Sequence, residues 1–185
     1  MTIATTKLTA EQYLMLGEDP PGVRLELVDG VIAVSPSPSI EHSYADTELR
    51  YYLRGYIKRH DLGVLLGDLD TIFDHLNVRR PDILFLAKSR LHLIHGHGIP
   101  IAPDLCVEIL SPSSATMDQV DKFDLYAKHR VTDYWIVDPK ARSLHGYHLK
   151  RKKYELAGTG RKKQKLSLPP FMDLEIPLGD LWVNF

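Results

Sequence analysis

The stretch "RRPDILFL", residues 79–86, has one carboxylate, Asp82, at the start of an apolar run that is typical of a β-strand. Twenty-six residues later, "PDLCVEIL", residues 103–110, has Glu108 inside a second such run. A buried, unpaired carboxylate costs free energy or raises its pKa until it is neutral. A shared divalent cation would keep both acids ionised, and Mg²⁺ or Mn²⁺ suits one or two carboxylates plus waters and phosphates. The alternative is that each acid faces solvent from a half-buried strand.

The composition is that of an ordinary globular protein. With 185 residues, 44% hydrophobic and 25% charged, the chain is long enough to bury a sizeable core. We expect a single domain over residues 1–185, with residues 1–7 as a disordered tail. The N-terminus has no basic segment followed by an apolar one, no apolar run reaches the roughly 18–20 residues of a membrane span, and Cys106 has no second cysteine to pair with. These features favour a cytoplasmic protein that does not enter a membrane.

The charge of the chain is unevenly distributed. The net charge of −1 argues against nonspecific nucleic-acid binding by the whole surface. Residues 150–165, "KRKKYELAGTGRKKQK", hold eight Lys or Arg and one acid, so the rest of the chain is near −8. This basic segment is either a solvated surface hairpin or a contact with the phosphate backbone of a nucleic acid. In the second case we expect contacts from Lys150, Arg151, Lys152 and Lys153.

The pattern of apolar residues predicts an α+β domain with a mixed central sheet flanked by two principal helices. Asp29-Gly30 between alternating runs predicts a hairpin. Amphipathic periodicity predicts long helices over residues 40–60 and about 115–129. We also expect a short helix in "LTAEQYLML", strands near residues 64–66, 70–73, 81–87, 104–110 and 133–139, a loop over 88–103, a hairpin from "SLHGYHL" and "KYELA", and a strand and a turn in "FMDLEIPLGDLWVNF".

The predicted helix over residues 115–129 carries two stripes of side chains. The apolar stripe, which we expect to face the core, consists of Val120, Phe123 and Ala127. A polar stripe beside it consists of Asp118, Lys122 and Tyr126, at i, i+4 and i+8. A lysine held there can orient an attacking water or stabilise charge that develops on a phosphate. The alternative is an exposed ion pair between Asp118 and Lys122, because Lys122 lies away from the centre of the apolar stripe.

Glu26 and His42 each have two open roles. In "RLELVDG", alternation puts Glu26 on the face opposite Leu25 and Leu27, where it either pairs on the surface or points into the same cleft as the other acids. His42 opens a predicted helix after a Pro/Ser-rich turn. A histidine there either caps the helix at the surface or faces a substrate, and the sequence alone does not decide.

Several stretches occur in an order that resembles the PD-(D/E)xK nuclease superfamily and, more closely, its Uma-type family of restriction-endonuclease-like proteins. The similar stretches are "RLELVDGVI", "SPSPSIEHS", "RRPDILFL", "APDLCVEILSPSS", "DQVDKFDLYAKHRVTDYWIVDP" and the closing hydrophobic tail, and they cover the chain from about residue 8 onward. The resemblance implies a restriction-endonuclease-like core, a homodimer, and a Mg²⁺- or Mn²⁺-dependent endonuclease that acts on DNA, with RNA as a second substrate class.

The resemblance also implies roles for individual residues. Asp82 and Glu108 would hold the metal from adjacent strands, with the backbone carbonyl of Ile109 as a third ligand. The superfamily's usual lysine, two places after the second acid, is replaced here by Leu110, and the family supplies it from the following helix, which matches Lys122. Glu26 would be a further catalytic residue, and His42, Asp118 and Tyr126 would bind substrate or support the metal ligands. Leu110 also leaves open a nuclease-fold protein without catalysis that serves in binding or regulation.

Overall fold

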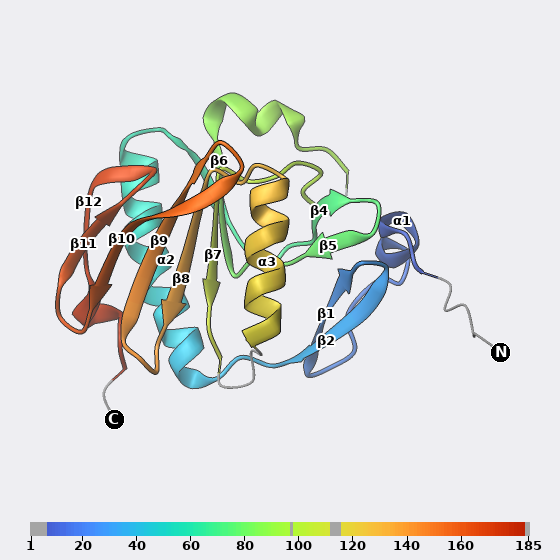
Figure 1. The fold of residues 1–185 in the computed structure, drawn as a ribbon, viewed down its shortest axis with the longest axis horizontal. Helices are drawn as coiled ribbons and strands as arrows, with labels where there is room; N and C mark the ends of the chain where they lie inside the picture. The colour runs from blue at the N-terminus through green and yellow to red at the C-terminus, as the bar shows by residue number, and fades with distance from the viewer. Residues whose placement is uncertain (1–6, 97, 112–115, 184–185) are drawn as a thin grey trace.

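A six-stranded mixed sheet with a long helix packed on each face is the main feature of the structure (Figure 1). The computed structural model describes residues 7–96, 98–111 and 116–183, without the side chains of residues 36 and 116–119. The expected tail, residues 1–7, lies almost wholly outside the described residues. No helix in the described part of the chain is long and apolar enough to cross a membrane.

The larger sheet has the strand order β10-β9-β8-β7-β6-β3. Its strands are β3 (Gly63–Leu66), β6 (Ile83–Ala87), β7 (Leu105–Ile109), β8 (Asp133–Asp138), β9 (Ser143–Lys150) and β10 (Lys153–Arg161). β7 and β8 run parallel, and the chain crosses between them through α3 (Thr116–Lys128), as a parallel pair requires. The other neighbours are antiparallel, which confirms the predicted mixed sheet.

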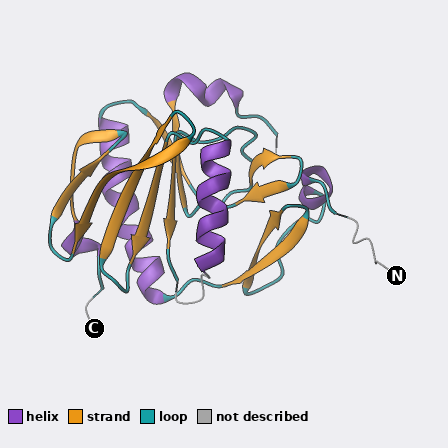
Figure 2. Ribbon diagram, in the orientation of Figure 1, coloured by secondary structure: helices purple, strands orange, loops and turns teal. Residues whose placement is uncertain are grey.

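A smaller sheet lies to one side of the larger one (Figure 2). Its strands, in the order β2-β1-β5-β4, are β1 (Val23–Val28), β2 (Val31–Pro36), β4 (Thr71–Asp74) and β5 (Asn77–Arg79). The predicted hairpin turn joins β1 to β2, with Asp29 and Gly30 at φ 48° and 78°, a left-handed geometry that Asp-Gly tolerates well. The remaining elements are α1 (Ala10–Leu14), α2 (Ile40–Arg59), the 3₁₀ helices η1 (Lys88–Leu93) and η2 (Leu178–Leu181), and the pair β11 (Lys165–Leu168) and β12 (Phe171–Pro177).

The core is divided between the two faces of the larger sheet. On one face, Leu53 and the rest of the buried stripe of α2 pack against Val107 and Trp135, all fully buried. On the other face, Tyr126 of α3 packs with Cys106. Because Cys106 and Val107 are consecutive residues of β7, the strand shows the alternation that sends neighbouring side chains to opposite faces.

Three elements of the described chain differ from the expectations. The strands β5 and β11 were not predicted, and η1 occupies part of the predicted loop over residues 88–103. Neither β5 (NVR) nor β11 (KLSL) contains two consecutive apolar residues, so neither forms an apolar run that can be recognised without its pairing partner. Their formation depends on pairing with β1 and β4 and with β12, which the local sequence does not reveal.

Candidate active site

The pairing of β6 with β7 brings Asp82 and Glu108 together. Ile83 pairs with Val107, so the antiparallel register continues to Asp82 opposite Glu108. Side chains directly opposite in such a pair have Cβ atoms about 4.5–5.5 Å apart. Since Ile83 and Val107 both face the α2 side, their neighbours Asp82 and Glu108 both face the α3 side. The two carboxylates therefore share one face of the sheet, at the end of two adjacent strands.

Asp82 is buried and accepts several hydrogen bonds. Its Oδ1 accepts from Arg24 Nη1 at 2.9 Å, and its Oδ2 accepts from the Ile109 N–H at 2.7 Å, with His42 Nε2 at 3.2 Å. Burial alone would raise the pKa of Asp82, but the bond to His42 and the charge of Arg24 hold that pKa well below its usual range. Asp82 is therefore a carboxylate at any pH near neutrality.

Glu108 lies in a different environment under α3. Tyr126 Oη donates a hydrogen bond to Glu108 Oε1 at 2.7 Å, and Lys122 Nζ donates to Oε2 at 2.9 Å. Burial raises the pKa of Glu108 to about 7, because the charge of Lys122 offsets only part of the desolvation and Asp82 adds repulsion. Glu108 therefore holds a proton more tightly than a glutamate in water does.

Lys122 is buried, with 6% of its surface exposed, and its position corrects the expectation for α3. The buried face of this helix contains Lys122, Leu125 and Tyr126, whereas Val120, assigned to the core stripe, is 55% exposed. The physical reason is that Glu108 makes part of the surface beneath the helix polar, so a lysine and a tyrosine face it. The burial of Lys122 contradicts the alternative of an exposed ion pair with Asp118. The side chain of Asp118 itself lies outside the described ones, so its role at the substrate or the metal ligands stays a prediction.

Glu26 of β1 points inward, toward the same lysine. It is buried, its Oε1 accepts the Arg80 N–H at 2.7 Å, and its Oε2 lies 3.7 Å from Lys122 Nζ. Arg79 Nη1 lies 3.8 Å from the same Oε2 atom. Glu26 is therefore not a surface pair, and the smaller sheet places a buried carboxylate beside the lysine that also faces Glu108.

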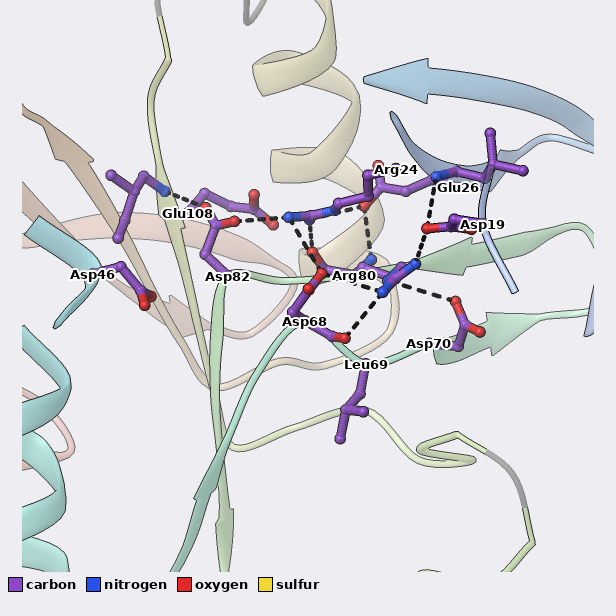
Figure 3. A network of polar contacts seen from close by, with 12 residues as sticks. Asp19, Arg24, Glu26, Asp46, Asp68, Leu69, Asp70, Arg80, Asp82 and Glu108 are labelled. Carbon is purple, nitrogen blue, oxygen red and sulfur yellow. Dashed lines mark hydrogen bonds and ion pairs between the residues drawn. The ribbon is translucent and has the colours of Figure 1, made fainter. Parts of the chain in front are cut away.

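Arg24 is a residue of the site that sequence reasoning missed. Figure 3 shows its guanidinium between Asp82 and Glu26, and Nη2 lies 3.5 Å from Glu26 Oε1. Burial lowers the pKa of Arg24, but the facing carboxylates raise it further, so the guanidinium stays charged. The signal in the sequence was its spacing from Glu26, because alternate residues of a strand share a face.

Most of the site residues line one open pocket of about 360 Å³, whereas Glu26 and Tyr126 lie behind its lining. Its lining includes Arg24, His42, Asp82, Glu108 and Lys122, which come from β1, α2, the start of β6, β7 and α3. The Nδ1 atom of His42 is buried and has no hydrogen-bond partner in the described part of the chain. The pocket thus offers carboxylates, cations and an unused imidazole nitrogen in one place.

The oxygen ligands available in this pocket are of the type that binds a small, hard cation. Among the described residues no group of three or more His, Cys, Asp or Glu side chains is arranged to hold a metal ion. Asp82 and Glu108 supply two carboxylates, which is as many as Mg²⁺ usually takes. The Leu110 N–H bonds to the Val137 carbonyl, so the backbone groups of Ile109 point the other way, toward Asp82. The predicted carbonyl ligand is therefore on the correct side of its strand.

The four basic residues expected to contact nucleic acid are not brought to this pocket. Lys150 and Lys153 are paired at the tip of the β9–β10 hairpin, and Ser143 lies at the pocket end of β9. Seven residues of strand separate Ser143 from Lys150, a distance of about 24 Å. Lys150 also pairs with Glu155 at 2.7 Å. All four residues are exposed, at the end of β9 and β10 opposite to Ser143.

A mixed sheet with two opposed carboxylates at adjacent strand ends, faced by a buried lysine, defines a restriction-endonuclease-like domain. The sequence profile of the Uma2 family, described as "Putative restriction endonuclease", matches residues 10–179, and the chain belongs to this family. The resemblance expected from the sequence is thereby confirmed.

Two relatives illustrate how far the likeness extends. An uncharacterized protein of Synechocystis sp. is 26% identical over 141 residues, which cover 75% of this chain and 79% of that protein. A crystal structure described as a putative nuclease belonging to DUF820, from Anabaena variabilis, superposes with a TM-score of 0.78 at 24% identity. That match covers 95% of this chain and 97% of the other, and it confirms the predicted fold class.

The replacement Glu108→Gln should change the pH dependence of stability. Burial raises the pKa of Glu108 from 4.5 to about 7, so the folded chain binds this proton more tightly than the unfolded chain. The contribution of the carboxyl group to the unfolding free energy therefore falls between these pH values, by at most about 1.4 kcal/mol per pH unit. Urea denaturation in EDTA should show the wild-type advantage over Glu108→Gln shrinking up to pH 7 and then levelling off. A difference that grows with pH would contradict this.

Proposed function

We propose that the chain is a metal-dependent endonuclease that hydrolyses phosphodiester bonds in DNA. The observation that carries the proposal is that the Lys122 ammonium lies 2.9 Å from Glu108, which stands opposite Asp82 in the same pocket. These three side chains come from separate parts of the chain and meet at one end of the larger sheet. Membership of the Uma2 family supports a nuclease-like function.

Asp82, Glu108 and the Ile109 carbonyl would hold the metal, with Mg²⁺ or Mn²⁺ as the cation that suits oxygen ligands. When bound, the ion would neutralise a phosphodiester oxygen and lower the pKa of a bound water. The protein fixes these ligands through their neighbours. The Ile109 N–H and His42 orient Asp82, and Tyr126 orients Glu108 through the 2.7 Å hydrogen bond from its hydroxyl.

The cations of the pocket have a second task in this proposal. Lys122 lies between Glu26 and Glu108, so its ammonium is held where it can donate to an attacking water or to a phosphate oxygen. Arg24 pairs with Asp82 in the structure described here. Its planar guanidinium suits a phosphate equally well, so Arg24 can turn to the substrate when Asp82 engages the metal.

Replacing Asp82 or Lys122 should strongly reduce cleavage by the folded chain. We expect Asp82→Ala and the isosteric Asp82→Asn to lower Mg²⁺- or Mn²⁺-dependent cleavage of single- and double-stranded DNA at least ~100-fold, and Lys122→Met to lower kcat by about 10²–10³-fold because a charge-stabilising donor is lost. Initial rates measured on end-labelled DNA check this.

The matched control for this experiment is Lys128→Met. Lys128 lies on the same helix, its side chain is 67% exposed, and it pairs with Asp74 rather than with an acid of the pocket. This variant should cleave like the wild type. Cleavage unchanged in Asp82→Ala, with circular dichroism showing a folded chain, would discard the assignment.

The second candidate is a nuclease-fold protein that binds or regulates without catalysis. The Arg24–Asp82 ion pair favours it, because a cation already neutralises one of the metal ligands, and Leu110 stands at the superfamily's usual lysine position. Calorimetric titration with Mn²⁺ and Mg²⁺ separates the two. For the endonuclease we expect saturable binding that is lost in Glu108→Ala. No binding at millimolar metal would instead support the second candidate.

The remaining expectations concern the setting of the site. We propose a cytoplasmic homodimer that acts on DNA, with RNA as the second substrate class. Light scattering on the purified chain checks the pairing, because one chain has a mass of 21.0 kDa and the dimer should show twice that value. A molar mass of one chain across the working concentrations would refute the dimer.

A further inference from the structure

Five exposed basic residues gather at the pocket end of the larger sheet. They come from the turn between β8 and β9 and from the end of β10 with the loop after it, and they are Lys140, Arg142, Arg161, Lys162 and Lys163. We call them the strand-end cluster. The last three belong to the basic segment of the sequence, but they lie at the opposite end of the sheet from the hairpin tip of residues 150–153.

A single row of paired residues connects the pocket with this cluster. Ile109 pairs with Val137, Val137 with Leu144, and Leu144 with Gly160. Neighbouring strands lie about 4.8 Å apart, so Gly160 is about 14 Å from the residue whose N–H binds Asp82. Arg161 follows Gly160 directly, and the cluster therefore begins about three strand spacings from the site.

The first turn of α2 joins the two regions. The ring of His42 lies 3.2 Å from Asp82 in the pocket. The preceding residue, Glu41, lines a second hollow together with Lys140 and Arg142. Since Glu41 and His42 are consecutive, the first turn of α2 lines both the pocket and the second hollow.

The backbone that carries the cluster is held in place. The Lys162 N–H donates to the Arg142 carbonyl at 2.8 Å, and the Trp182 indole N–H donates to the Lys162 carbonyl at 2.7 Å. The Arg161 N–H donates to the side-chain oxygen of Gln164 at 2.7 Å. The two loops are thus tied to each other and to the C-terminal segment, so binding an anion would order only the side chains.

We propose that the strand-end cluster binds the phosphates of the DNA strand that leaves the pocket, an inference that rests on the proposed function. The span of about 14 Å corresponds to about four nucleotides of a stacked strand at ~3.4 Å each. Phosphate contacts of this kind set the register of the nucleic acid and do not read its sequence. The hairpin tip, about 24 Å along the strands from the pocket end, has no part in this contact.

The test compares two double variants that remove the same charge. Lys162→Gln with Lys163→Gln alters the cluster, and Lys152→Gln with Lys153→Gln alters the hairpin tip; all four residues are exposed. The readout is the affinity for a short fluorescein-labelled DNA duplex, measured in EDTA as a function of salt. We expect the cluster variant to bind at least ~10-fold more weakly, with a salt slope reduced by about 2. The tip variant should match the wild type, and Lys162→Arg with Lys163→Arg should restore binding.

The outcomes separate this inference from the proposed function. If the wild type cleaves DNA but the cluster variant keeps its affinity and salt slope, the inference is overturned and the endonuclease stands. If the cluster variant loses binding but no metal supports cleavage by the wild type, the DNA contact of the strand-end cluster is supported and the endonuclease proposal is refuted. Equal losses in both variants, no binding by the wild type, or binding of RNA in place of DNA would each overturn the inference.

Discussion

The register between β6 and β7 is the constraint on which the rest of the site depends. It sets Asp82 opposite Glu108 on a buried face of the sheet. Two like charges there raise the free energy of the folded chain unless nearby cations offset their repulsion. Arg24 and Lys122 supply those cations from a second sheet and from a helix. A slip of one residue along β7 would send Glu108 into the apolar layer under α2.

Much of the fold and part of the site can be predicted from the sequence. Alternation and turn chemistry indicate most of the strands, and the apolar setting of Asp82 and Glu108 marks them as unusual acids. The burial of Lys122 cannot be predicted in this way. Helical periodicity assigns apolar residues to the buried face, so it favours Val120 over a lysine. Lys122 is buried because it pairs with Glu108, and only the folded sheet places Glu108 beneath this helix. Arg24 was missed for the same reason, since an arginine beside an acid on a strand is ordinarily a surface pair.

The basic segment shows a different limit of sequence reasoning. Residues 150–165 form one continuous block of positive charge along the chain. A strand runs through the middle of that block, so its two halves lie at opposite ends of the sheet. The amino-acid composition of residues 150–165 therefore predicts one basic surface, whereas the folded chain has two separate ones. Only the half that begins at Arg161 shares an end of the sheet with Asp82.

The position of Lys122 has a consequence for how such proteins are recognised. In this chain the amine that faces Glu108 comes from α3, while Leu110 occupies the strand position two places after that acid. A lysine has a long, flexible side chain, so a different segment can supply it as long as its amine reaches the glutamate. A motif search that requires a lysine two places after the second acid would therefore not find the lysine that faces Glu108 in this chain.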